Sequence, residues 1–225
     1  MEESIETILR QIRTDLRLSM DGVVAASMRA KGIDYRMNFG VKIPQIREIS
    51  TRYKTGKALA ELLWKEPVRE LKILATMLYP AKEMDQDTAI RWAKGIENHE
   101  LREQSCRNLF QEVPFADALV VDWIQHPDEK VRNTGYWLYA RLCMVYPETV
   151  KTISGAMLLE HALQDLKSDS LLLRQSALNA LKFMGRMSEG YAERVLQGIE
   201  SLQEINDEMK SEMIDLLRFE FGYMD

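Results

Sequence analysis

Four expected helix starts in this chain repeat the same pair of residues, an apolar residue followed at once by arginine. The pairs are Val68-Arg69, Leu101-Arg102, Val131-Arg132 and Leu173-Arg174. Successive arginines are 33, 30 and 42 residues apart, which is the period of helical repeats that stack side by side. This repeat predicts a chain built from similar helical pairs, in which each pair buries its apolar face against its neighbours.

Helical periodicity extends over most of the 225 residues, and no period-two alternation is long enough to predict a strand. We expect helices at residues 4–18, 21–30, 43–53, 57–65, 66–79, 85–96, 99–112, 115–126, 128–146, 147–166, 169–187, 188–200 and 205–221, with a break in the tenth near Ser154-Gly155. The predicted fold is an all-α, right-handed superhelical α-solenoid of about six helical pairs. No linker divides the sequence, so a single domain over residues 1–225 is expected.

Composition narrows the possible function classes. The net charge of −5 argues against indiscriminate binding to nucleic acid, although a local basic stripe remains compatible with an acidic body. Cys106 and Cys143 lack metal-ligand spacing and are expected to be buried, reduced thiols. No apolar segment resembles a secretion signal or a membrane span. We therefore expect a cytoplasmic protein that needs no metal or other cofactor.

The repeated arginines have two interpretations of about equal weight. If consecutive inner helices line a concave surface, their arginines form a ladder of cations that suits a phosphate backbone. In the other interpretation each arginine is solvated or paired with an acidic neighbour. Further cations that widen the possible track are Lys42, Arg47, Arg107, Lys130, Lys182 and Arg186.

Two segments carry a family resemblance. Residues 39–47 read FGVKIPQIR and residues 62–70 read LLWKEPVRE. Together they resemble the amino-terminal signature of the HEAT-like-repeat alkylpurine DNA glycosylases, the AlkD-like DNA alkylation repair proteins, and weaker similarity extends to about Gly190. The resemblance implies a curved HEAT-like repeat that wraps duplex DNA on its concave face. It also implies metal-free hydrolysis of the N-glycosidic bond of cationic alkylated purines.

The catalytic motif of that family, Trp-Asp-x-x-Asp, aligns with residues 99–103, which read HELRE. The alignment keeps an acid at both carboxylate positions and places Glu103 in the catalytic position, where it would stabilise the sugar cation. His99 replaces the tryptophan. The family's second aromatic residue falls on Asn179, and the cation that follows it falls on Lys182. The resemblance also implies that Arg132 contacts the DNA backbone.

The candidate site residues also have ordinary structural interpretations. Glu103, with Arg102 and Arg107 nearby, is more simply a surface ion-pair partner. His99 is a common kind of polar residue in the first turn of a helix. Trp123, Trp137 and Tyr139 lie in apolar helices and are expected in the core.

Three hypotheses follow from the sequence. The favoured one is a monomeric repeat protein that binds duplex DNA independently of sequence and whose base-excision site is degenerate. The DNA-binding residues expected are Lys42, Arg47, Arg102, Arg107, Arg132, Arg174 and Lys182. The second hypothesis is an active glycosylase that uses Glu103, with His99 or Tyr136 standing in for the missing rings. The third is a scaffold for protein partners, which the acidic net charge favours.

Overall fold

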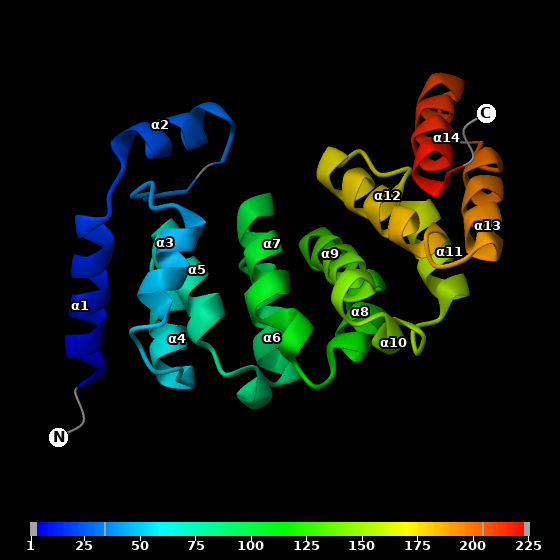
Figure 1. Ribbon diagram of the computed structural model, residues 1–225. Helices are drawn as coiled ribbons and strands as arrows, with labels where there is room; N and C mark the ends of the chain where they lie inside the picture. Colours follow the sequence, from blue (N-terminus) through cyan, green and yellow to red (C-terminus); the bar gives the residue numbers. More distant parts are fainter. Residues whose placement is uncertain (1–3, 34, 204, 223–225) are drawn as a thin grey trace. The chain divides into compact units, whose positions relative to one another are not determined.

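The computed structural model describes residues 4–33, 35–203 and 205–222 of the chain (Figure 1). Regular structure in these residues is helical, apart from one isolated bridge between Met37 and Val68, so the prediction of an all-α chain is confirmed. Backbone contacts divide the chain into two compact units, residues 1–114 and residues 115–225. The expectation of a single domain stays a prediction.

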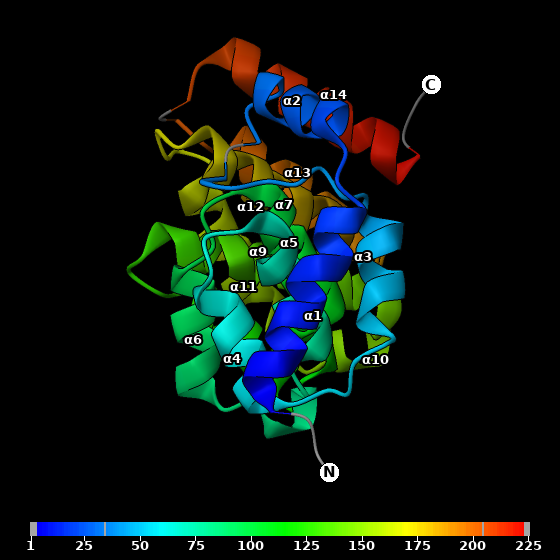
Figure 2. The ribbon, with the colours of Figure 1, turned by 90° about the vertical axis from the view of Figure 1, so that its left-hand side faces the viewer.

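Unit 1 is built around helix α5. Its helices are α1 (Ile5–Leu18), α2 (Gly22–Ala30), α3 (Ile43–Ser50), α4 (Lys57–Lys65), α5 (Arg69–Leu78), α6 (Gln86–Lys94) and α7 (His99–Asn108), with 3-10 turns η1 (Ala81–Glu83) and η2 (Phe110–Glu112). Helix α5 packs against α3, α4 and α7, and α1 packs on α3 and α4 (Figure 2). Because α5 has neighbours on three sides, nearly all of its side chains are buried, including the charged side chains of Arg69 and Glu70.

An aromatic cluster joins α4 to α6 in unit 1. The rings of Trp64 and Trp92 stack with their centroids 4.2 Å apart, and Tyr79 meets Trp92 edge-on at 5.2 Å. Such pairs contribute about 0.5–1.5 kcal/mol beyond the area that they bury. The cluster therefore links consecutive helical pairs within the unit.

Unit 2 is built around α9 and α12. Its helices are α8 (Ala116–Ile124), α9 (Glu129–Val145), α10 (Pro147–Val150), α11 (Gly155–Asp165), α12 (Leu171–Gly185), α13 (Glu189–Glu200) and α14 (Asp207–Phe221). Helix α9 packs against α8 and α12, and α12 also contacts α11, α13 and α14. Trp123 and Tyr139 are buried as expected, while Trp137 is half-buried and donates a hydrogen bond to Ser176 Oγ (3.1 Å).

Most helix positions agree with the sequence prediction, and two boundaries are informative. The break near Ser154-Gly155 is confirmed, because the Ser154 hydroxyl accepts a hydrogen bond from Met157 N and begins α11 there. Helix α5 begins at Arg69 and not at residue 66. Val68 is extended and pairs with Met37, whose carbonyl oxygen accepts from Arg69 N at 2.9 Å.

The sequence also predicted the state of the two cysteines and the absence of a membrane span. Neither Cys106 nor Cys143 forms a disulfide, and Cys106 is buried as expected, whereas Cys143 is half-buried. Burial raises the pKa of Cys143 to about 11. In the described parts of the chain, no helix combines the length and the apolar character needed to cross a bilayer. Those same residues contain no cluster of three or more His, Cys, Asp or Glu side chains placed to hold a metal ion.

Candidate nucleic-acid interface

Arg69, the first of the repeated arginines, is buried in a cluster of charges in unit 1. Its Nε and Nη2 atoms donate to the two carboxylate oxygens of Glu100 at 2.8 and 2.6 Å. Its Nη1 atom donates to Val41 O at 2.7 Å and to Glu70 Oε1 at 3.0 Å. Because Arg69 is only 2% exposed, its guanidinium cannot contact a phosphate that approaches from solvent. Arg69 therefore joins α5 to α7 and does not form part of a surface ladder.

Glu70 connects this cluster to the FGV turn that precedes α3. Its carboxylate accepts hydrogen bonds from Phe39 N (3.1 Å) and Val41 N (3.2 Å). Gly40, between these two residues, has a φ of +75°, which glycine adopts readily. The glycine and glutamate that carried the family resemblance thus form one structural unit at the start of α3.

Glu100 is the first acid of the motif aligned with the glycosylase site, and its carboxylate is already engaged. It accepts from Arg69 at both oxygens and from the Tyr35 hydroxyl at 3.0 Å. The side chain is 14% exposed. Burial is the main cause that raises the pKa of Tyr35, and the negative charge of Glu100 raises it further. The phenol therefore stays a proton donor at neutral pH.

Glu103, the second acid of the motif, is in a different state. It lies on α7, is half-buried, and makes no hydrogen bond or ion pair with the residues that the structure describes. The expectation that it is a surface ion-pair partner is therefore wrong. The carboxylate remains available to a ligand. His99 is exposed in the first turn of the same helix.

The cations predicted for unit 1 separate into exposed and buried side chains. Lys42 and Arg107 are exposed, and Arg47 is exposed while its Nη2 donates to Asn108 Oδ1 at 3.1 Å. Arg102 is 3% exposed, so it presents almost no surface to a phosphate. The expected ladder of surface arginines is therefore wrong for both Arg69 and Arg102, because packing of α5 and α7 buries their side chains.

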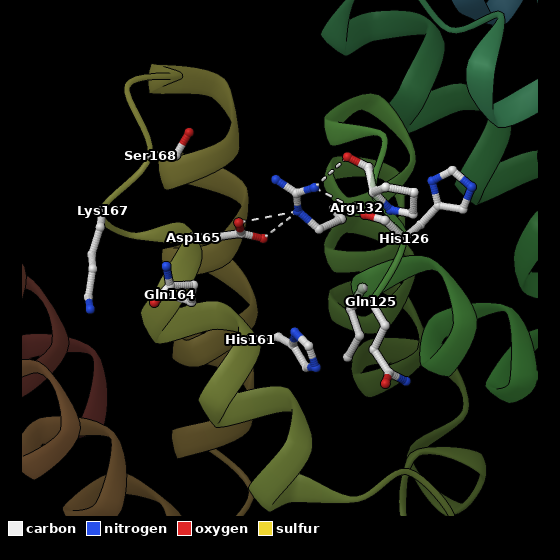
Figure 3. Close-up of a pocket in the computed structure, with 10 residues that line it drawn as sticks. Gln125, His126, Arg132, His161, Gln164, Asp165, Lys167 and Ser168 are labelled. Atoms are coloured by element: carbon white, nitrogen blue, oxygen red, sulfur yellow. Dashed lines mark hydrogen bonds and ion pairs between the residues drawn. The ribbon is translucent and has the colours of Figure 1, made fainter.

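Arg132, on α9 in unit 2, lies in a pocket of about 410 Å³ (Figure 3). Its Nε donates to both oxygens of Asp165 at 3.2 and 3.0 Å, and its Nη1 donates to the carbonyl oxygens of His126 and Pro127, both at 3.0 Å. Nη2 makes no hydrogen bond within the described chain, and it points toward the side where Ser168 lies. The side chain is 22% exposed. The contacts therefore orient the guanidinium and leave one nitrogen for a ligand.

Asp165 joins Arg132 to the core of unit 2. Besides Arg132, it accepts a hydrogen bond from the Tyr136 hydroxyl at 2.8 Å. Tyr136 is fully buried, so the expectation that its ring could replace a missing aromatic residue of the glycosylase site is wrong. Burial, followed by the charge of Asp165, raises the pKa of Tyr136. The Arg132–Asp165 pair spans 33 residues and the Arg69–Glu100 pair spans 31, so in each unit a repeated arginine pairs with a carboxylate about one repeat later.

Replacing Asp165 with alanine is expected to lower the free energy of unfolding by about 3 kcal/mol. The change leaves the Tyr136 hydroxyl buried without an acceptor and removes the charge opposite Arg132. Urea denaturation followed by circular dichroism measures the loss. Asp122→Ala is the control, because Asp122 is exposed and has no partner in the described residues, and it should change stability by less than about 0.5 kcal/mol. Equal costs for the two variants would contradict the assigned role of Asp165.

The two cations predicted on α12 are both engaged within unit 2. Arg174 Nη1 donates to Ser168 O, and Lys182 Nζ forms an ion pair with Glu220 of α14 at 3.2 Å. Arg186, one turn after Lys182, donates to the same carboxylate. Both Arg174 and Lys182 are half-buried, so their surfaces are only partly covered.

Sequence reasoning did not identify Tyr35, Glu70, Asp165 or Glu220 as partners of the candidate residues. For Asp165 and for Glu100 a signal was present, namely an acid about one repeat period after a repeated arginine. Glu70 directly follows Arg69 in the segment that carried the resemblance. Glu220 lies 38 residues after Lys182 and 34 after Arg186, which is again close to one repeat. Tyr35 lies 65 residues from Glu100, and no spacing indicated this contact.

The sequence matches the model of the family described as DNA alkylation repair enzyme over residues 12–189, which is more than half of the chain. The chain belongs to this DNA alkylation repair family. No match was found among curated proteins. The residues outside the matched range include all of α14.

A solved structure confirms the fold of this alkylation repair family member as an all-α solenoid. It is similar to this chain with a TM-score of 0.74 and 16% identity, and the match covers 97% of both chains. It represents a family described as related to the HEAT-like repeat DNA glycosylases, with affinity for branched DNA structures. A designed armadillo repeat protein is also similar, with a TM-score of 0.41 and 12% identity, covering 79% of this chain and 92% of that one.

Proposed function

We propose that this alkylation repair family member holds duplex DNA independently of sequence and does not excise bases. The observation that carries the proposal is the state of the aligned motif on α7. Glu100 is committed to Arg69 and Tyr35 inside the protein. The tryptophan position is taken by an exposed histidine, His99.

Base excision from a cationic purine leaves a sugar with oxocarbenium character. A carboxylate and the faces of aromatic rings stabilise this cation. In this chain the carboxylate of Glu100, one of the two aligned acids, is already bound by Arg69. The two aligned aromatic positions hold His99 and Asn179. Glu103 alone retains the required chemistry. These changes favour a protein that keeps the DNA-binding surface of its family after losing the catalytic site.

Exposed cations provide the means of holding DNA. In unit 1 these are Lys42, Arg47 and Arg107, and in unit 2 the exposed Lys130 and the free Nη2 atom of Arg132 add donors. Each phosphate contact releases condensed counterions, so the affinity falls steeply as salt rises. Because the whole chain has a net charge of −5, attraction to DNA comes from these local cations and not from the protein as a whole. A DNA-holding role is compatible with the cytoplasmic location expected from the sequence.

Binding of a fluorescent duplex at increasing salt tests this proposal. We expect the variant Lys42→Gln/Arg107→Gln to bind about tenfold more weakly than the wild type, with the salt slope reduced by about one to two. The matched control is Lys82→Gln/Lys94→Gln, which makes the same change in net charge at exposed lysines of η1 and α6. Because the structural neighbour is described as binding branched DNA, a four-way junction belongs in the same assay.

Equal weakening in both double variants would mean that binding depends on net charge and not on the α3 and α7 cations. Absence of binding to either DNA at low salt would contradict the DNA-holding role and leave the scaffold hypothesis.

The second candidate function is an active glycosylase, which the unpaired carboxylate of Glu103 favours. Under this alternative, Glu103→Gln abolishes release of free base from a duplex that carries a methylated purine, because loss of such charge stabilisation typically costs about 10²–10³ in rate. DNA affinity should be unchanged. Glu97→Gln is the control, since Glu97 is exposed just before α7. Under our proposal the wild type itself releases no base above the spontaneous rate.

A further inference from the structure

Helix α14 contacts two cations at the end of α12, Lys182 on the helix and Arg186 directly after it. Glu220, near the end of α14, accepts from Lys182 Nζ at 3.2 Å and from Arg186 Nη2. Both cations also lie over the ring of Phe183, at 5.8 Å for Lys182 and 5.4 Å for Arg186. One carboxylate therefore occupies both positive charges at the end of α12.

The electrostatics of this contact favour an ionised Glu220. Burial by itself would raise the pKa of the carboxyl group, but the hydrogen bonds and charges of Lys182 and Arg186 hold the pKa below its ordinary value. Helix α14 is acidic as a whole, because its Asp and Glu residues outnumber its single lysine and single arginine. Like a nucleic acid, α14 presents negative charge to Lys182 and Arg186.

The absence of a side chain at Gly185 allows α14 to come this close. A Cβ atom at Gly185 would lie 2.1 Å from Cζ of Phe221, the last residue of α14. The Phe221 ring thus fills the space beside α12, and its neighbour Glu220 reaches the two cations.

The remainder of α14 is packed more loosely. Met213 and Leu217 are buried, but Leu216 and Phe219 are exposed. A groove of about 240 Å³ lies between α12 and α14, and its lining includes apolar side chains as well as Arg174, Gln175 and Glu212. Elements with few buried contacts open at low free-energy cost. Glu220 itself is half-buried and Arg186 is exposed, so an anion from solvent can reach these ion pairs and displace the Glu220 carboxylate without unfolding the unit.

We propose that α14 is an intramolecular competitor: Glu220 occupies Lys182 and Arg186 in the free protein, and a DNA phosphate displaces it. This inference rests on the DNA-binding function proposed above. It limits weak, non-specific attachment to DNA, because a ligand must supply enough other contacts to open the α12–α14 ion pairs.

The test compares duplex binding by the wild type, Glu220→Gln and Glu208→Gln in a salt titration. Glu208 is the matched control, since it is exposed on α14, has no partner among the described residues, and its change alters net charge equally. We expect Glu220→Gln to bind about two- to fivefold more tightly than Glu208→Gln. Its salt slope should be steeper by about one to two, because two cations become available. Equal affinities would overturn the inference.

Two further variants make the result specific. In the background of Glu220→Gln, the changes Lys182→Gln and Arg186→Gln should remove the gain, and a gain that persists would overturn the inference. Gly185→Ala should displace Phe221 and with it Glu220, so it should raise affinity in the same direction. Circular dichroism checks that each variant keeps its helix content. Gly185→Ala carries the test if Glu220→Gln does not fold.

A heparin column separates this inference from the proposed function. If no variant binds DNA, the DNA-holding role fails, and the salt at which each variant elutes from heparin decides the inference alone. Later elution of Glu220→Gln than of Glu208→Gln would support competition by α14 for a polyanion site. Coincident elution would overturn it.

Discussion

Arg69→Met is expected to lower the free energy of unfolding by about 3–5 kcal/mol. The guanidinium donates four hydrogen bonds, two to Glu100, one to Glu70 and one to Val41 O. Its removal leaves two carboxylates in a buried environment without a compensating charge. Urea denaturation followed by circular dichroism, together with tryptophan fluorescence from the Trp64–Trp92 stack, measures the loss in unit 1.

The exposed Arg107 provides the control for this result. Arg107→Met removes the same charge and should cost less than about 0.5 kcal/mol. Adding Glu70→Gln and Glu100→Gln to Arg69→Met should recover part of the loss, because the unpaired charges are then removed. An Arg69→Met variant as stable as Arg107→Met would contradict the structural role of the cluster.

Gly40→Ala is the second change with a large expected effect, a loss of about 3 kcal/mol or more. The left-handed backbone, with φ at +75°, costs an alanine roughly 1–2 kcal/mol. In addition, a Cβ atom would lie 2.0 Å from Asp21 O and 2.8 Å from Ala25 N. These two backbone atoms form a hydrogen bond of α2 at 3.0 Å, so the start of α2 must move.

Gly22→Ala is the matched control for Gly40→Ala. Gly22 is the first residue of α2, and a Cβ atom there would meet nothing within 4 Å. Alanine at this position should leave stability unchanged or raise it by about 0.4–1 kcal/mol, because it restricts the unfolded chain. Thermal unfolding of both variants checks the pair. Similar midpoints for Gly40→Ala and the wild type would mean that α2 does not pack on the FGV turn.

The positions of the helices could be predicted from local sequence, because apolar periodicity, capping residues and prolines act over a few residues. The predicted helix boundaries were wrong where a tertiary contact determines the end of a helix. Helix α5 starts at Arg69 because the preceding Val68 pairs with Met37, a residue more than one helix away in the sequence. Nothing local to residues 66–69 specifies that partner.

The candidate site was harder to predict for the same reason. An arginine in the first turn of a repeat helix has the same local sequence whether it faces solvent or the next repeat. Arg69 and Arg132 pair with carboxylates 31 and 33 residues later, and only the spacing of these acids distinguishes the two cases. The state of Glu103 depends on which side chains surround α7, which the helix's own sequence does not determine.

The central claim is tested most directly by measuring base release from duplex DNA that carries a methylated purine, at protein concentrations that saturate binding of the same duplex. The wild type is predicted to bind, with an affinity that falls steeply with salt, and to release no base above the spontaneous rate. Release that disappears in Glu103→Gln would contradict the claim and establish an active glycosylase. Failure to bind the duplex at low salt would contradict the DNA-binding part of the claim.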